Sequence, residues 1–105
     1  MGLEAATRAY HSAIRWGDFE GAYGLLAPEL RTEAELPAVL ADLRVTRYEV
    51  LQPPVIRPDD SATQTVSIEY LFEYNQVVRS LTDRQVWRWD DDAKTWWLHS
   101  GLPAF

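Results

Sequence analysis

The chain has 105 residues, of which 47 % are apolar and 25 % charged, so we expect a single domain, residues 1–105, with one hydrophobic core. Its formal net charge of −6 argues against nucleic-acid and anionic-membrane partners, because both bind positively charged surfaces. The absence of cysteine excludes disulfides and thiolate chemistry. No apolar run approaches the length of a membrane span.

Helical periodicity begins almost at Met1. Apolar residues spaced three and four apart predict an amphipathic helix over residues 3–16. Gly17 favours a left-handed end to this helix, and Asp18 can cap a second, shorter helix that stops before Pro28. The sequence therefore predicts two helices separated by a Gly-Asp corner.

A third helical segment is expected around residues 36–43. The stretch Thr32-Glu-Ala-Glu35 has the form of a capping box, and apolar residues follow it at helical spacing. Pro37 fits poorly inside a helix, which leaves the start of this segment open.

The rest of the chain is typical of strands and turns. Residues 45–57 are predicted to be extended, with a bulge or bend at Pro53-Pro54 that suits an edge strand. A turn at Pro58-Asp-Asp-Ser61 follows, since proline presets φ and aspartate side chains bond backbone amides. Thr63 to Tyr74 alternates apolar and polar side chains, which predicts a central strand with one buried face.

This central strand is expected to form a hairpin with residues 77–89. A two-residue reversal at Asn75-Gln76 would place Ile68 opposite Asp83. The same register puts two polar residues, Asp83 and Gln85, on the apolar face of the sheet.

The last strand, residues 95–102, has two registers open to it. A four-residue loop before it turns Trp96 and Leu98 inward and Trp97 and His99 outward, whereas a five-residue loop reverses the two sets. We favour the four-residue loop because Trp96 and Leu98 make the better core pair.

Together these elements predict an α+β fold in which two to three N-terminal helices pack on a curved, mostly antiparallel sheet of about four strands. The segment from Arg15 to Leu26, the strand from Thr82-Asp83 to Trp87, and Trp96-Trp97-Leu98 after an acidic loop resemble the nuclear-transport-factor-2-like superfamily. The resemblance spans nearly the whole chain and implies a cystatin-like cone, shallow here because the chain is short for that family.

The resemblance implies a range of functions. The superfamily includes ketosteroid isomerases, dehydratases and polyketide cyclases beside many non-catalytic domains, and a small variant occurs in bacterial envelope lipoproteins. Fold alone does not choose among these functions. The compartment also stays open: the cytoplasm if the chain is complete, or the cell envelope or periplasm if a signal or lipid anchor precedes it.

Asp83 is the candidate catalytic residue. An apolar face disfavours an ionised carboxylate, and a raised pKa would suit Asp83 to act as a general acid or base. The cyclase and isomerase relatives use an aspartate on a pocket-facing strand in a broadly similar way, and His99 would be its partner under the five-residue loop. The candidate pocket residues are Tyr10, Tyr70, Gln85 and Trp87. In the structural interpretation, Asp83 instead bonds Tyr10, Tyr70 or a backbone amide and holds the sheet to a helix.

The sequence predicts neither a metal nor a cofactor. His11 and His99 lie on unrelated elements and lack the spacing of a metal-binding pair. The run Asp90-Asp91-Asp92 lacks the glycine and the distant glutamate of a calcium loop.

Three functional hypotheses follow. The leading one is a non-catalytic small binding or protein-interaction module, with a small apolar ligand as one partner and a homodimer through the outer sheet face, centred on Trp97, as another. The alternative is a small-molecule isomerase, dehydratase or cyclase that uses Asp83 as acid or base. The third is an accessory domain of the cell envelope.

Overall fold

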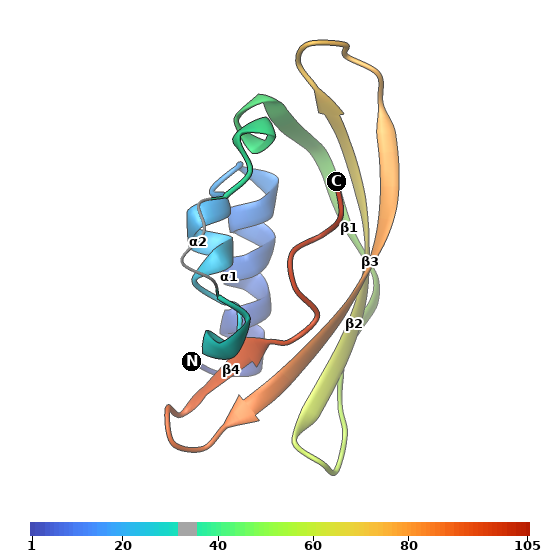
Figure 1. Ribbon diagram of the computed structural model, residues 1–105. Helices are drawn as coiled ribbons and strands as arrows, with labels where there is room; N and C mark the ends of the chain where they lie inside the picture. The colour runs from blue at the N-terminus through green and yellow to red at the C-terminus, as the bar shows by residue number, and fades with distance from the viewer. Residues whose placement is uncertain (32–35) are drawn as a thin grey trace.

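The fold combines one main helix with a four-stranded antiparallel sheet (Figure 1). The computed structural model describes residues 1–31 and 36–105. The helices are α1 (Leu3–Arg15) and the five-residue α2 (Phe19–Tyr23), followed by two 3-10 turns, η1 (Pro28–Leu30) and η2 (Ala38–Asp42). The strands are β1 (Leu43–Ile56), β2 (Ser61–Phe72), β3 (Arg79–Asp90) and β4 (Thr95–Leu98). The predicted α+β class is confirmed.

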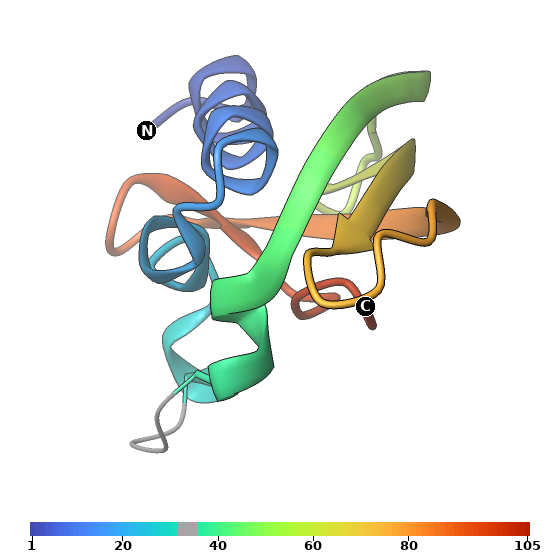
Figure 2. The ribbon, with the colours of Figure 1, turned by 90° about the horizontal axis from the view of Figure 1, so that it is seen from above.

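Helix α1 packs its apolar stripe against the sheet, which curves around the helical layer (Figure 2). Ala6, Tyr10 and Ile14 are fully buried on this stripe. Gly17 follows the helix with a φ of +77°, a conformation that glycine adopts without a steric penalty. The Asp18 side chain then accepts a hydrogen bond of 2.9 Å from the Gly21 amide and caps α2.

The number of helices differs from the prediction of two to three. α1 is the one main helix of the described residues, because α2 spans only five residues and contains a poor helix former, Gly21. The expected third helix is replaced by η2, which begins directly after Pro37. The predicted capping box, Thr32–Glu35, lies outside the described residues.

The sheet is a meander with the order β1-β2-β3-β4. The alternation predicted for the central strand is confirmed, since every second side chain of β2 is buried: Ala62, Gln64, Val66, Ile68, Tyr70 and Phe72. The favoured face of the last strand is also confirmed. Trp96 and Leu98 are buried, and they lie opposite Trp89 and Trp87 of β3.

The predicted register between β2 and β3 is wrong by two residues. Asp83 lies opposite Val66 rather than Ile68, because the strands are joined by six residues, 73–78, instead of a two-residue reversal. A shift of two residues keeps each side chain on its predicted face. Asp83 and Gln85 therefore still point toward the helical layer.

The predicted last strand is too long. β4 ends at Leu98, and Gly101 then adopts a φ of +80°, which turns the chain away from the sheet. The C-terminal residues run back between the helices and the sheet (Figure 1). There the Phe105 ring packs edge-on against Tyr70 and Phe19, with centroids 5.0 and 6.0 Å apart.

The two edges of the sheet differ in their backbone partners. The outer edge of β4 is hydrogen-bonded to the backbone of residues 25–27. The Leu98 amide donates to the Leu25 carbonyl at 2.9 Å, and the Ala27 amide donates to the Leu98 carbonyl at 2.9 Å. The Trp96 amide donates to the Met1 carbonyl at 3.2 Å. Within the described residues, no main-chain segment bonds the outer edge of β1 in this way.

We expect Leu98→Ala to lower the free energy of unfolding by about 2–5 kcal/mol, because it removes a fully buried side chain of the hydrophobic core. Urea denaturation followed by tryptophan fluorescence measures the change. The control is Leu30→Ala, since Leu30 is 39 % exposed and its truncation should alter stability by less than about 0.5 kcal/mol. Equal losses in both variants would contradict the observed inward face of β4.

Candidate functional site

The candidate site is a buried polar network on the face of the sheet that α1 covers. Asp83 and Gln85 are adjacent inward positions of β3, 9 % and 1 % exposed. The Gln85 side-chain amide donates a hydrogen bond of 3.0 Å to Asp83 Oδ2. This bond gives the buried carboxylate a polar partner inside an otherwise apolar layer.

Gln85 connects all three long strands. Its Nε2 also donates to the Tyr48 hydroxyl of β1 at 2.9 Å, while its Oε1 accepts from Gln64 Nε2 of β2 at 3.2 Å and from Trp87 Nε1 at 3.1 Å. Both donor hydrogens and both acceptor positions of the amide are therefore used. We call Tyr48, Gln64, Asp83, Gln85 and Trp87 the Gln85 network.

Tyr10 of α1 packs against the Gln85 network from the helix side. Its ring packs edge-on against Trp87, with centroids 5.7 Å apart. Its hydroxyl is buried and has no hydrogen-bond partner among the described residues. Burial, reinforced by the nearby Asp83 and Tyr48, raises the pKa of Tyr10 well above its ordinary value.

The ionisation of the network follows from its burial. Burial raises the pKa of Asp83, and the hydrogen bond from Gln85 opposes part of that increase. Burial likewise raises the pKa of Tyr48 to about 12, although the Gln85 bond again acts in the opposite direction. Both tyrosines of the site therefore stay protonated at neutral pH, and the Tyr48 hydroxyl keeps a proton to donate.

A cleft of about 180 Å³ lies beside the network, between α1 and the sheet. Its wall includes the His11 imidazole, stacked on the Tyr48 ring with centroids 4.1 Å apart and planes 19° apart. Burial and, to a smaller extent, Arg15 lower the pKa of His11, so its ring is neutral at pH 7. The complete lining is Glu4, Thr7, Arg8, His11, Tyr48, Val50 and Gln64.

The structure brings together Asp83 and three of the predicted pocket residues, Tyr10, Gln85 and Trp87. It does not bring Tyr70 to them, because Tyr70 lies four residues along β2 from the position opposite Asp83 and packs against Phe105.

His99 lies on the other face of the chain from Leu98. Its Nδ1 is 3.8 Å from Glu29 Oε1, and its amide donates to the Val86 carbonyl at 2.7 Å. His99 therefore makes its contacts away from Asp83, as expected for the four-residue loop.

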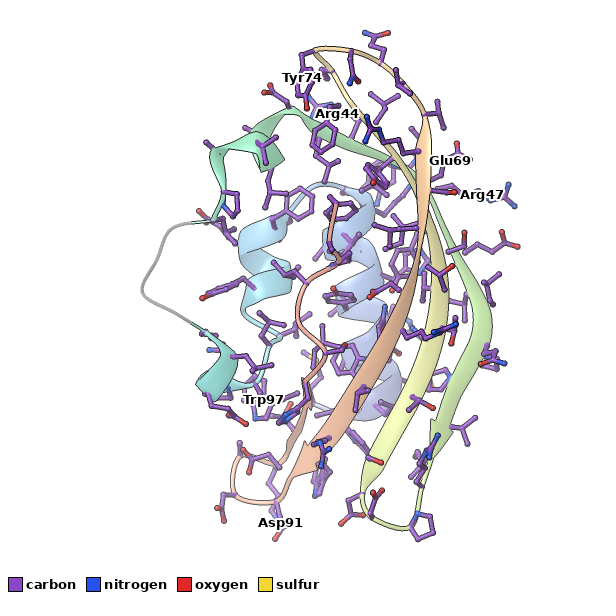
Figure 3. All side chains as sticks on the ribbon, turned by 45° about the vertical axis from the view of Figure 1, so that its right-hand side comes forward. Arg44, Arg47, Glu69, Tyr74, Asp91 and Trp97 are labelled. Carbon is purple, nitrogen blue, oxygen red and sulfur yellow. The ribbon has the colours of Figure 1, made fainter. Side chains whose placement is uncertain are left out.

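Trp97, the predicted centre of an interface, lies on β4 (Figure 3). It is half-buried. Its Nε1 donates to Asp90 Oδ2 at 3.1 Å, and the Arg31 guanidinium lies 5.0 Å from its ring centroid. The guanidinium itself bonds the carbonyls of Gly24 and Leu26. Arg31 thus covers part of the Trp97 ring, which was predicted to contact a partner.

A second cleft is apolar and lies at the other end of the helical layer. It has a volume of about 230 Å³ and is lined by Phe19, Pro37, Val39, Leu40, Leu102, Pro103, Ala104 and Phe105. Both aromatic members of this lining already pack against one another. All eight side chains of its lining are apolar.

In the described part of the chain, no group of three or more histidine or acidic side chains is arranged to hold a metal ion. No helix among these residues is long and apolar enough to cross a membrane. The chain matches no family model, no curated protein and no solved structure.

Sequence reasoning missed the role of Gln64. Its signal was present, since Gln64 is a polar residue on the inward side of an otherwise apolar alternation. The stacking of His11 on Tyr48 had no such signal, because the two residues lie on elements whose distance the sequence does not specify.

We expect Gln85→Met to lower the free energy of unfolding by about 3 kcal/mol or more. The substitution keeps the side-chain length but leaves several buried polar groups without partners, including the Asp83 carboxylate and the Trp87 indole N–H. Urea denaturation at pH 7 measures the loss. Gln76→Met in the exposed β2–β3 connection is the matched control and should change stability by less than about 0.5 kcal/mol.

Asp83→Asn should change how stability depends on pH. The pKa of Asp83 is higher in the folded than in the unfolded chain, so its stabilising contribution is full below the unfolded pKa and is lost as pH rises through the folded pKa. The asparagine variant should therefore gain stability relative to the wild type as pH rises above about 4, the unfolded pKa of aspartate.

Urea denaturation from about pH 3 to about pH 7 tests the sign. Asp59→Asn is the control, because hydrogen bonds from Ser61 lower the pKa of the exposed Asp59, so its stability relative to the wild type should change only below about pH 4. A stability difference between wild type and Asp83→Asn that is constant with pH would contradict a raised pKa of Asp83.

Proposed function

We propose that this chain is a small, non-catalytic binding domain whose ligand site is the cleft between α1 and the sheet. The observation that carries the proposal is the position of the Gln85 network beneath that cleft. Tyr48 and Gln64 line the cleft and are both bonded to Gln85, so their polar atoms are held in place before a ligand arrives. Preorganised polar groups at the floor of a cleft reduce the entropy lost on binding.

The same network argues for binding rather than catalysis. Asp83 lines neither this cleft nor the apolar one, and Gln85 stands between it and Tyr48. A general acid or base needs to approach the proton that it transfers to within hydrogen-bond distance or one water. Asp83 is instead bonded to a fully occupied amide, as expected of a residue that stabilises the sheet.

The cleft favours a compact, uncharged polar ligand. Glu4 and Arg8 form an ion pair at its rim, and the His11 ring is neutral, so the lining carries no excess charge. The Tyr48 hydroxyl can donate a hydrogen bond, and Gln64 Oε1 accepts none from the residues that the structure describes. A cleft of about 180 Å³ is smaller than typical drug-sized sites and suits a fragment-sized molecule.

Membership of the nuclear-transport-factor-2-like superfamily is part of this proposal. It is supported by the helix–Gly-Asp–helix corner, by the curved antiparallel sheet, and by helices on one face of that sheet. Because the superfamily includes many non-catalytic domains, the assignment agrees with a binding function.

Binding should be measured by amide chemical-shift changes in the labelled chain, titrated with acetamide, benzamide and glycerol as probes. We expect at least one probe to shift residues around the cleft, and Tyr48→Phe to weaken its binding about tenfold because the donor hydroxyl is lost. His11→Ala should also weaken binding, whereas the matched control His99→Ala should leave it unchanged. Shifts confined to Phe19, Leu102 and Phe105 would instead identify the apolar cleft as the site.

A second candidate is an isomerase, dehydratase or cyclase in which Asp83 moves a proton. It is favoured by the raised pKa of Asp83 and by the Tyr10 hydroxyl, which has no hydrogen-bond partner within residues 1–31 and 36–105. This candidate requires that substrate reach the carboxylate past Gln85. In any assay that shows turnover, Asp83→Asn should lower kcat severely. An unchanged rate in that variant would exclude Asp83 as the acid or base.

A further inference from the structure

The outer half of β1 carries an exposed apolar segment. Residues 50–56 contain no charged side chain, and four of them are large, apolar and widely exposed: Val50 at 42 %, Leu51 at 51 %, Val55 at 60 % and Ile56 at 61 %. Such a concentration of exposed aliphatic side chains marks an interaction surface more often than an ordinary one. We call residues 50–56 the β1 apolar segment.

This segment lies on the free edge of the sheet. The β1–β2 hairpin extends beyond α1 (Figure 1), and the outer edge of β1 has no backbone partner among the described residues. The pairing with β2 is irregular between Val50 and Gln52 and again between Gln52 and Val55. Because Pro53 and Pro54 also lack N–H groups, an incoming strand would be held there mainly by side chains.

Charged residues flank the segment on both sides. If a second copy ran antiparallel to the first, they would face residues of opposite charge. Antiparallel pairing of two copies centred on Pro53 places Val50 opposite Ile56 and Leu51 opposite Val55. The same alignment places Glu49 of one copy opposite Arg57 of the other. This pair joins opposite charges, and by symmetry it occurs twice in the dimer.

The faces of the side chains agree with this alignment. Val50 and Ile56 pair with Val66 and Ala62, both on the α1 side of the sheet. Glu49 pairs with Ser67 on the opposite side, and Arg57 is the first residue after β1, where its amide donates to the Ser61 carbonyl at 2.8 Å. Val50 and Ile56, which the alignment places opposite one another, therefore project to the same face, as antiparallel pairing requires.

We propose that the β1 apolar segment binds the same segment of a second copy of this chain, antiparallel and centred on Pro53. The resulting dimer is closed, because the other edge of the sheet is already bonded to Met1 and to residues 25–27. The proposed surface differs from that of Trp97 and shares Val50 with the ligand cleft.

Sedimentation equilibrium from about 10 µM to 1 mM tests the proposal. We expect the 12.1 kDa chain to approach twice that mass as its concentration rises. Ile56→Lys should raise the dimer dissociation constant at least tenfold. Val78→Lys is the matched control, because Val78 is 58 % exposed in the β2–β3 connection and lies outside the segment, so it should leave dimerisation unchanged. A chain that stays monomeric, or equal effects of both lysines, would overturn the proposal.

A charge exchange tests the alignment itself. Glu49→Lys alone and Arg57→Glu alone should each remain monomeric, since like charges then face one another across the dimer. An equimolar mixture of the two variants should form a heterodimer in which both facing pairs are opposite in charge. Circular dichroism melts of each variant check that it is folded. A wild-type dimer together with a mixture that does not associate would show that the copies are aligned differently.

Discussion

The geometry of this molecule depends on the saturated amide of Gln85. A buried amide that lacked one hydrogen-bond partner would lower the free energy of unfolding. An amide with all of its hydrogen bonds instead specifies how far the strands lie from one another. Through Tyr48 and Gln64 it sets β1 and β2 relative to β3, and through Trp87 it is linked to the ring of Tyr10 on α1. The same bonds shield Asp83, so the requirement for stability also decides what the acidic side chain can do.

Much of the fold could be predicted from local pattern. Alternation in β2 identifies its buried face, and the choice of Trp96 and Leu98 as the core pair identifies the face of β4. Both predictions state only which face of the sheet a side chain points to. An error in loop length leaves that face unchanged as long as the error is an even number of residues. The β2–β3 connection is longer than predicted, yet Asp83 still faces α1.

The Gln85 network could not be predicted, because it depends on which residue of β2 lies opposite each residue of β3. Moving β3 by two residues along β2 changes the residue opposite Gln85 from Val66 to Gln64. Only the second arrangement lets the two amides bond to each other. The absence of a third main helix has a different cause: tertiary packing supports α2 and η2 only as short turns, where Gly21 and Pro37 oppose a longer helix.

β1 divides at Tyr48 into two halves with different roles. Before Tyr48 the strand is held by the core and by the Arg15 side chain, which donates to the Val45 carbonyl at 2.7 Å. After Tyr48 the strand leaves the cover of α1, and irregular pairing and prolines follow. Irregular pairing and prolines hinder the addition of other strands to the edge, but the aliphatic side chains of the edge remain exposed. Val50 belongs to both the cleft and the apolar segment, so in the proposed dimer Ile56 of the second copy would lie beside the cleft and extend its wall.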